Sequence, residues 1–195
     1  MLLIMCTGGP VTGRSTTAKT LQEYFTSIDV ESQICGKTES KYSLDSVKLD
    51  VYRWINQGSP EVMIIDGNSG SYFDRKEILD SVDDVAKMNN VEYNVIAINH
   101  ERSEKFMFAH NKDKGHHAYT EKRMYSLMRL VQQPIREENI DLIFRVKHNH
   151  NVDMHNLIAL INKYIGTEYP VPEAEVDTSA DMDETSVECT EETVE

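Results

Sequence analysis

The stretch Gly8-Gly9-Pro10-Val11-Thr12-Gly13-Arg14-Ser15-Thr16 holds the residues whose types and spacing could most directly do chemistry. It follows a short apolar run and matches the pattern G-x-x-x-x-G-K-[ST], except that Arg14 stands where lysine belongs. In this pattern glycines let backbone N–H groups close around phosphate oxygens, and the final hydroxyl ligates Mg²⁺. The N-terminus of the following helix adds partial positive charge. The stretch therefore predicts a nucleotide-binding loop.

Because Arg14 replaces the lysine of the pattern, nucleotide binding and phosphoryl transfer must be considered separately. An arginine is always charged and can hold a phosphate through two hydrogen bonds, but it is bulkier than lysine and not equivalent to it. The sequence thus predicts that the loop binds phosphate, whereas phosphoryl transfer is a separate question.

A second candidate site lies at the end of the apolar run Val62-Met63-Ile64-Ile65, where Asp66-Gly67-Asn68 follows. Enzymes with a phosphate loop place a carboxylate near Mg²⁺ or its waters at the end of such a strand. The alternative is an ordinary turn, because Asp-Gly is a common turn sequence. The phosphate loop upstream favours the functional interpretation of Asp66.

A third candidate is a cationic hairpin between two predicted helices. The segment His110-Asn111-Lys112-Asp113-Lys114-Gly115 is broken by glycine and lies between helices expected at 102–111 and 120–133. Such a hairpin suits a mobile lid that brings positive charge onto a transferring phosphoryl group and excludes water. A solvated basic loop is the alternative.

Strand-like and helical segments alternate along the chain. The predicted strands are 2–6, 30–35, 61–66, 92–99 and 141–146. The predicted helices are 14–26, 43–57, 74–89, 102–111, 120–133 and 152–165. Strands that are apolar on both faces indicate a buried parallel sheet, and the alternation indicates βαβ units. We therefore predict an α/β, three-layer sandwich with a five-stranded parallel sheet.

The charge is concentrated at one end of the chain. Of a formal net charge of −13, eleven acidic residues fall between Glu168 and Glu195, so the remainder carries only −13 + 11 = −2. We predict one domain over 1–166 and a disordered acidic tail over 167–195. The tail is either a solubilising segment or an arm that binds a protein partner or mimics nucleic acid.

Targeting signals and disulfide patterns are both lacking in the sequence. The first apolar run is too short for a signal peptide, and no run approaches the roughly 18 apolar residues of a membrane span. The 3 cysteines show neither a disulfide framework nor zinc-ligand spacing. We therefore predict a cytoplasmic protein with no membrane partner.

The order of motifs resembles a known family. After the phosphate loop come Ile65-Asp66-Gly67-Asn68 with Arg75, then His110-Asn111-x-x-Lys114-Gly115, then Glu121, Met128 and Pro134. This order is similar to that of the small P-loop kinases, AAA-type ATP-binding proteins grouped around the phage polynucleotide 5′-hydroxyl kinase domain. It also resembles the related tRNA-kinase-like and zeta-toxin-like proteins. The resemblance covers roughly residues 1–146.

The resemblance implies ATP, Mg²⁺ and transfer of the γ-phosphoryl group to a hydroxyl, often on a nucleic acid or nucleotide. It implies catalytic roles for Asp66 and for Lys114, with Arg75 near the acceptor. It also implies that Ser15 and Asp66 hold the metal. The residues that it implies for nucleotide binding are Gly8, Gly9, Gly13, Arg14, Ser15, Thr16, Asn68 and His110. If the protein is viral, the compartment is the host cytoplasm.

The sequence departs from the family pattern at three places. Arg14 replaces the loop lysine, and His110 and Lys114 stand where the family has lid arginines. The family's general base follows the second strand, where this chain offers Glu39, with Asp45 as a distant substitute.

Two main hypotheses follow. The first is an ATP-dependent kinase acting on a polynucleotide 5′ end, a nucleoside or a nucleotide. The second is a catalytically impaired pseudokinase that serves as a nucleotide-binding or protein-interaction module. Other P-loop hydrolases are a smaller class of alternatives.

Overall fold

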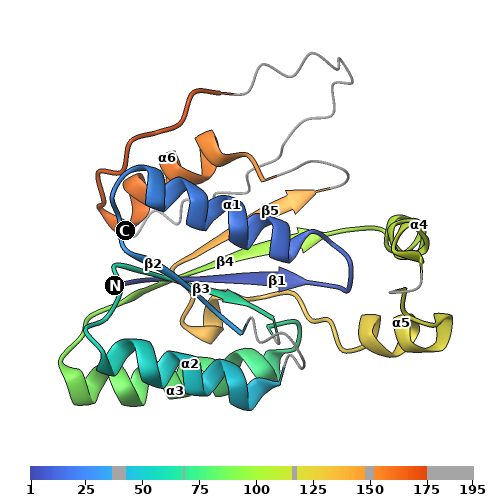
Figure 1. Cartoon of the computed structure of the whole chain (residues 1–195), viewed down its shortest axis with the longest axis horizontal. Coiled ribbons are helices and arrows are strands. Elements are labelled where there is room, and N and C mark those ends of the chain that lie inside the picture. The colour runs from blue at the N-terminus through green and yellow to red at the C-terminus, as the bar shows by residue number, and fades with distance from the viewer. Residues whose placement is uncertain (37–42, 68, 116–117, 148–151, 175–195) are drawn as a thin grey trace, which may run out of the picture.

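A single parallel sheet forms the centre of the protein. The computed structural model describes residues 1–36, 43–67, 69–115, 118–147 and 152–174. Within them five strands pair in parallel, in the order β2-β3-β1-β4-β5 (Figure 1). The strands are β1 (Leu2–Gly8), β2 (Ser32–Cys35), β3 (Val62–Asp66), β4 (Asn94–Glu101) and β5 (Leu142–Lys147). The predicted fold class is confirmed.

Helices cover both faces of the sheet (Figure 1). Helices α1 (Arg14–Ser27) and α6 (Met154–Ile165) pack on one face, where alternate strand residues such as Ile4 and Ile96 form the core. Helices α2 (Leu44–Asn56) and α3 (Tyr72–Asn89) pack on the other face, over residues such as Met5. Because both faces are covered, β1 and β3 are buried throughout.

Two short helices lie beyond the carboxyl edge of the sheet (Figure 1). They are α4 (Glu104–Asp113) and α5 (Glu121–Met128). The predicted helix 120–133 is wrong at its carboxyl end, because the backbone N–H of Gln132 donates to the carbonyl oxygen of Gly70 at 2.8 Å. The chain then forms a 3₁₀ turn, η2 (Arg136–Glu138), which the sequence did not predict.

Packed structure continues past the predicted domain end at residue 166. The ring of Tyr169 lies 5.2 Å from that of Phe25, edge to face, and the Tyr169 N–H donates to Asn162 Oδ1 at 2.9 Å. The hydroxyl of Tyr24 donates to the carbonyl of Pro170. Residues up to 174 therefore belong with the folded part, and residues 175–195 of the predicted tail lie outside the described residues. In the part of the chain that is described, no helix is long and apolar enough to cross a membrane.

Candidate active site

Backbone conformation shapes the loop between β1 and α1. Gly8 has a φ of 129°, and a Cβ there would lie 2.7 Å from the carbonyl oxygen of His100. Gly13, with a φ of 95°, sits at the N-cap of α1 and has no side chain to cap the helix. The first turn of α1 contains no acidic residue, so its N–H groups and positive helix end are left for an anion.

The predicted loop residues do not all face the same side. Gly8, Gly13, Arg14, Ser15 and Thr16 line one open cleft of about 1450 Å³. Gly9 lies behind the loop instead: its carbonyl accepts a hydrogen bond from Thr12 Oγ1 at 2.9 Å, and a Cβ on it would lie 2.7 Å from Met107 Sδ. The role of Gly9 is to allow this close packing, which the motif alone did not distinguish from phosphate contact.

Ser15 and Asp66 meet at the bottom of the cleft. The Ser15 hydroxyl donates to Asp66 Oδ1 at 2.9 Å, although 51 residues separate them in the sequence. Asp66 ends β3 and is only 3% exposed. The parallel pairing of β1 with β3, Cys6 opposite Asp66, places the carboxylate beside the loop. A hydroxyl and a carboxylate are the oxygen ligands that Mg²⁺ prefers, so this pair fits the implied metal.

Arg75 is buried away from the cleft, which corrects its predicted place near an acceptor. Its guanidinium is 0% exposed and forms a bidentate ion pair with Glu138, with N···O distances of 2.6 and 2.7 Å. Its remaining N–H groups donate to four backbone carbonyls, those of Ser69, Gly70, Gln132 and Gln133. A guanidinium whose donors are used in this way ties the loop after β3 to the segment before η2.

Helices α4 and α5 form the predicted hairpin over one side of the cleft. Asn111, 5% exposed, joins α4 to the segment that leads into α5: its amide donates to the Tyr119 carbonyl and accepts from the Tyr119 N–H, both at 2.8 Å. His110 and Lys114 line the cleft. The His110 ring stacks on Phe106 with centroids 3.9 Å apart. His110 lies in the last turn of α4, and Lys114 is the C-cap of the same helix.

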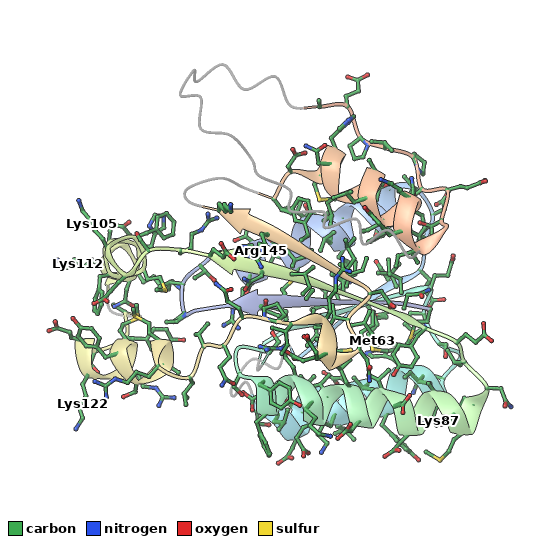
Figure 2. All side chains as sticks on the ribbon, turned by 180° about the vertical axis from the view of Figure 1, so that it is seen from behind. Met63, Lys87, Lys105, Lys112, Lys122 and Arg145 are labelled. Atoms are coloured by element: carbon green, nitrogen blue, oxygen red, sulfur yellow. The ribbon has the colours of Figure 1, made fainter. Side chains whose placement is uncertain are left out.

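Positive charge predominates along the cleft. Five of its lining residues are Arg or Lys and two are Asp: Arg14, Arg102, Lys105, Lys114 and Arg123 against Asp66 and Asp74. Residues 102–130 hold seven Lys or Arg and three Asp or Glu, in a chain of net charge −13. Figure 2 shows that Lys112 and Lys122 project from the outer side of α4 and α5. Such a cleft attracts polyanions such as nucleoside triphosphates.

His100 is a cleft residue to which the sequence motifs assign no role. It pairs with Gly8 in the β1–β4 register, is 4% exposed and lines the cleft. Burial, and then the charges of Arg102 and Arg14, lower the pKa of His100 from 6.5 to about 4. The imidazole is therefore neutral at physiological pH.

This depressed pKa predicts an acid-sensitive stability. An unfolded histidine binds a proton near pH 6.5, whereas folded His100 does so only near a pKa of about 4. The unfolded state therefore gains protons first as pH falls, and the free energy of unfolding drops by up to about 1.4 kcal/mol per pH unit. Urea unfolding between pH 7 and pH 4 should show His100→Gln losing about 2–3 kcal/mol less stability than the unchanged protein. Parallel pH profiles for the two proteins would contradict the assignment.

Two predicted site residues, Glu39 and Asn68, lie outside the described residues. The structure adds Asp74, His100 and Arg123 to the cleft. His100 could have been found from the rule that ligands bind beyond the carboxyl ends of parallel strands. Arg123 carries no such signal, because the packing of α5 against α4 decides which face of that helix meets the cleft.

Comparison with known proteins supports the fold alone. No protein-family model matches the chain, and no curated sequence matches it. Among solved structures, a fungal RNA kinase superposes with a TM-score of 0.64 at 14% identity, over 86% of this chain and 89% of that one. A sugar kinase from Janibacter sp. HTCC2649 gives a TM-score of 0.57 at 8% identity, over 85% and 95%.

A third structure shares the arrangement. The adenylyl-sulfate (APS) kinase of Mycobacterium tuberculosis, solved in complex with AMPPNP and APS, gives a TM-score of 0.51 at 10% identity, over 85% of this chain and 97% of that one. The three structures are kinases by name, and their sheet and helices superpose on most of this chain. The chain therefore has the fold of the P-loop kinases.

Proposed function

We propose that the protein is an ATP-dependent kinase that transfers the γ-phosphoryl group to a hydroxyl on a polynucleotide 5′ end, a nucleoside or a nucleotide. The observation that carries the proposal is the 2.9 Å hydrogen bond between Ser15 and Asp66, which joins the phosphate loop to the end of β3 inside a cationic cleft. Among the kinases that share this fold, one is an RNA kinase by name and another was solved with AMPPNP and APS, which supports the choice of chemistry.

Each residue has a role in this proposal. The backbone N–H groups after Gly13 and the guanidinium of Arg14 would hold the β- and γ-phosphates. Ser15 and Asp66 would hold Mg²⁺, which supplies neutralisation of charge on the phosphate oxygens. Lys114 and His110 would bring positive charge and hydrogen bonding from the hairpin as the acceptor binds.

The proton of the acceptor hydroxyl needs a base. Glu39, which follows β2, is our candidate from the sequence. A second candidate is Asp74, which lies in the first turn of α3 and lines the cleft. A base must come within about 2.6–3.2 Å of the hydroxyl oxygen. Single Glu39→Gln and Asp74→Asn variants, assayed with a common acceptor, distinguish the two. A general base acts only when it is deprotonated, so it makes kcat rise with pH on the acidic side of the profile. The base is the residue whose replacement removes this rise.

Nucleotide binding is the first test. Calorimetric titration of the full chain with Mg·ATP should give a dissociation constant in the micromolar range, which corresponds to about −8 kcal/mol. Gly13→Asp should abolish the binding, because its carboxylate would repel phosphate at the helix N-terminus. Gly166→Asp is the matched control: Gly166 also has a positive φ, 77°, and open space around it, but it lies outside the cleft.

The outcomes separate the two hypotheses. Binding that is lost in Gly13→Asp and kept in Gly166→Asp justifies a screen with labelled ATP against 5′-hydroxyl oligonucleotides, nucleosides and nucleotides. Binding without transfer to any acceptor supports a pseudokinase, in which Arg14 retains the nucleotide without turnover. No binding up to millimolar nucleotide would refute the kinase and would leave a pseudokinase that acts as a protein-interaction module.

A further inference from the structure

A buried imidazole in the cleft has no hydrogen-bond partner among the residues that the structure describes. Within the described part of the chain, neither Nδ1 nor Nε2 of His100 has a hydrogen-bond partner, although the residue is only 4% exposed. A buried polar group without a partner costs free energy, so native proteins rarely keep one without a reason. Because His100 lines the cleft, a ligand in the cleft can supply the missing partner.

The register of the sheet fixes where this imidazole lies. Along β4, Ile96 and Ile98 face the core under α1 and α6, and His100 falls two residues further on the same face. Its neighbours across the sheet are Gly8 in β1 and Val146 in β5. The side chain is therefore on the side of the sheet where the phosphate loop opens α1.

The charges around His100 select the ligand. The guanidiniums of Arg102 and Arg14 are its electrostatic neighbours, and after burial itself their charges lower the pKa of His100 further. Two positive charges disfavour a metal cation at this nitrogen and favour an anion. A neutral imidazole carries one N–H donor, which can serve a phosphate oxygen without adding a further charge to the site.

We propose that His100 is a nucleotide-binding residue whose imidazole N–H donates a hydrogen bond to a phosphoryl oxygen of the nucleotide held by the phosphate loop. The proposal rests on the proposed function, since it needs a nucleotide in the cleft. It gives His100 a part in holding the phosphate chain beside Arg14, on the β4 side of the loop. Ser15 and Asp66 then hold the metal on the β3 side.

Calorimetry on the full chain tests the contact with three variants. His100→Leu removes the donor and keeps an apolar side chain in the site, whereas His100→Gln keeps an amide N–H that reaches the position of Nε2. His155→Leu is the matched control, because His155 lies on α6, outside the cleft, where its Nδ1 contacts the Pro172 carbonyl at 2.8 Å. Each protein is titrated with Mg·ATP and with magnesium tripolyphosphate, and each is melted without ligand.

The expected result has three parts. His100→Leu should weaken Mg·ATP binding by about tenfold or more, the effect of losing a hydrogen bond to a charged group. The loss should be of the same size for tripolyphosphate, because the contact is to the phosphate chain. Without ligand, His100→Leu should melt at the same temperature as the unchanged protein or higher. The dissociation constant of His100→Gln for Mg·ATP should lie within about threefold of that of the unchanged protein.

Other results overturn the proposal. Unchanged ATP affinity in His100→Leu would mean that the imidazole contacts no ligand. A loss seen for ATP and absent for tripolyphosphate would place the contact on the sugar or base. Equal losses in His100→Gln and His100→Leu would point to side-chain shape rather than a donor. If the unchanged protein itself binds no Mg·ATP, the proposed function fails, which is a different result from any of these.

Discussion

Asp66→Asn is expected to lower the rate of phosphoryl transfer by at least about a hundredfold, the size of effect that follows removal of one group that stabilises charge in a transition state. The fold should survive, because asparagine keeps an oxygen that can accept the Ser15 hydroxyl, now 2.9 Å from Asp66 Oδ1. What the variant loses is the negative charge that our proposal places next to Mg²⁺. Transfer from labelled ATP to the best acceptor, at saturating nucleotide, measures the effect.

The control for this experiment is Asp84→Asn, which removes an exposed carboxylate from α3. It should transfer phosphate at the rate of the unchanged protein. Magnesium titration adds a second readout, since Asp66→Asn should need more Mg²⁺ for half-maximal activity. If Asp66→Asn retains full activity at low Mg²⁺, our assignment of the metal site is wrong.

Breaking the buried ion pair is expected to have the largest effect on stability. Arg75 and Glu138 have side chains that are 0% and 2% exposed, and Glu138→Ala would leave the guanidinium charge buried without its carboxylate. Removal of one partner from such a pair costs about 3–5 kcal/mol. Urea unfolding should therefore show Glu138→Ala less stable by that amount, with Tm lower by roughly 6–20 °C.

A double variant separates the cost of an unpaired charge from the cost of lost packing. Arg75→Met combined with Glu138→Leu removes both charges, so it should be less destabilising than the sum of the two single variants. The exposed pair of Lys76 and Asp80 is the control, and Asp80→Ala should cost less than about 1 kcal/mol. Strict additivity in the buried pair would contradict a direct interaction.

The ion pair also explains how the loop after β3 is positioned. Arg75 bonds the carbonyls of Ser69 and Gly70 and, across the chain, those of Gln132 and Gln133. Gly70 lines the cleft, so the pair supports the wall of the site without contacting what binds there. The sequence pattern located Arg75 near the site but could not distinguish a residue that contacts substrate from one that braces the loop.

Where an element's boundary depends on local residues, the sequence predicted it closely. The strand at Val62–Asp66 and the helix from Arg14 to Ser27 lie within one residue of the predicted 61–66 and 14–26. Both begin or end at residues with strong local preferences, such as Gly13 at a positive φ. The helix at 120–133 was overextended because its end depends on a hydrogen bond from Gln132 to Gly70, across 62 residues of chain.

By itself the sequence determined the glycine-rich loop between β1 and α1, the parallel sheet and the position of Asp66 at a strand end. These features follow from glycine spacing and from apolar runs, which act over a few residues. Only the tertiary structure decided that Ser15 meets Asp66 and that Arg75 pairs with Glu138. It also decided that His100 lines the cleft with no hydrogen-bond partner among the described residues. The physical reason is that each of these depends on the register between strands and on the packing of distant segments, which fix what a side chain touches.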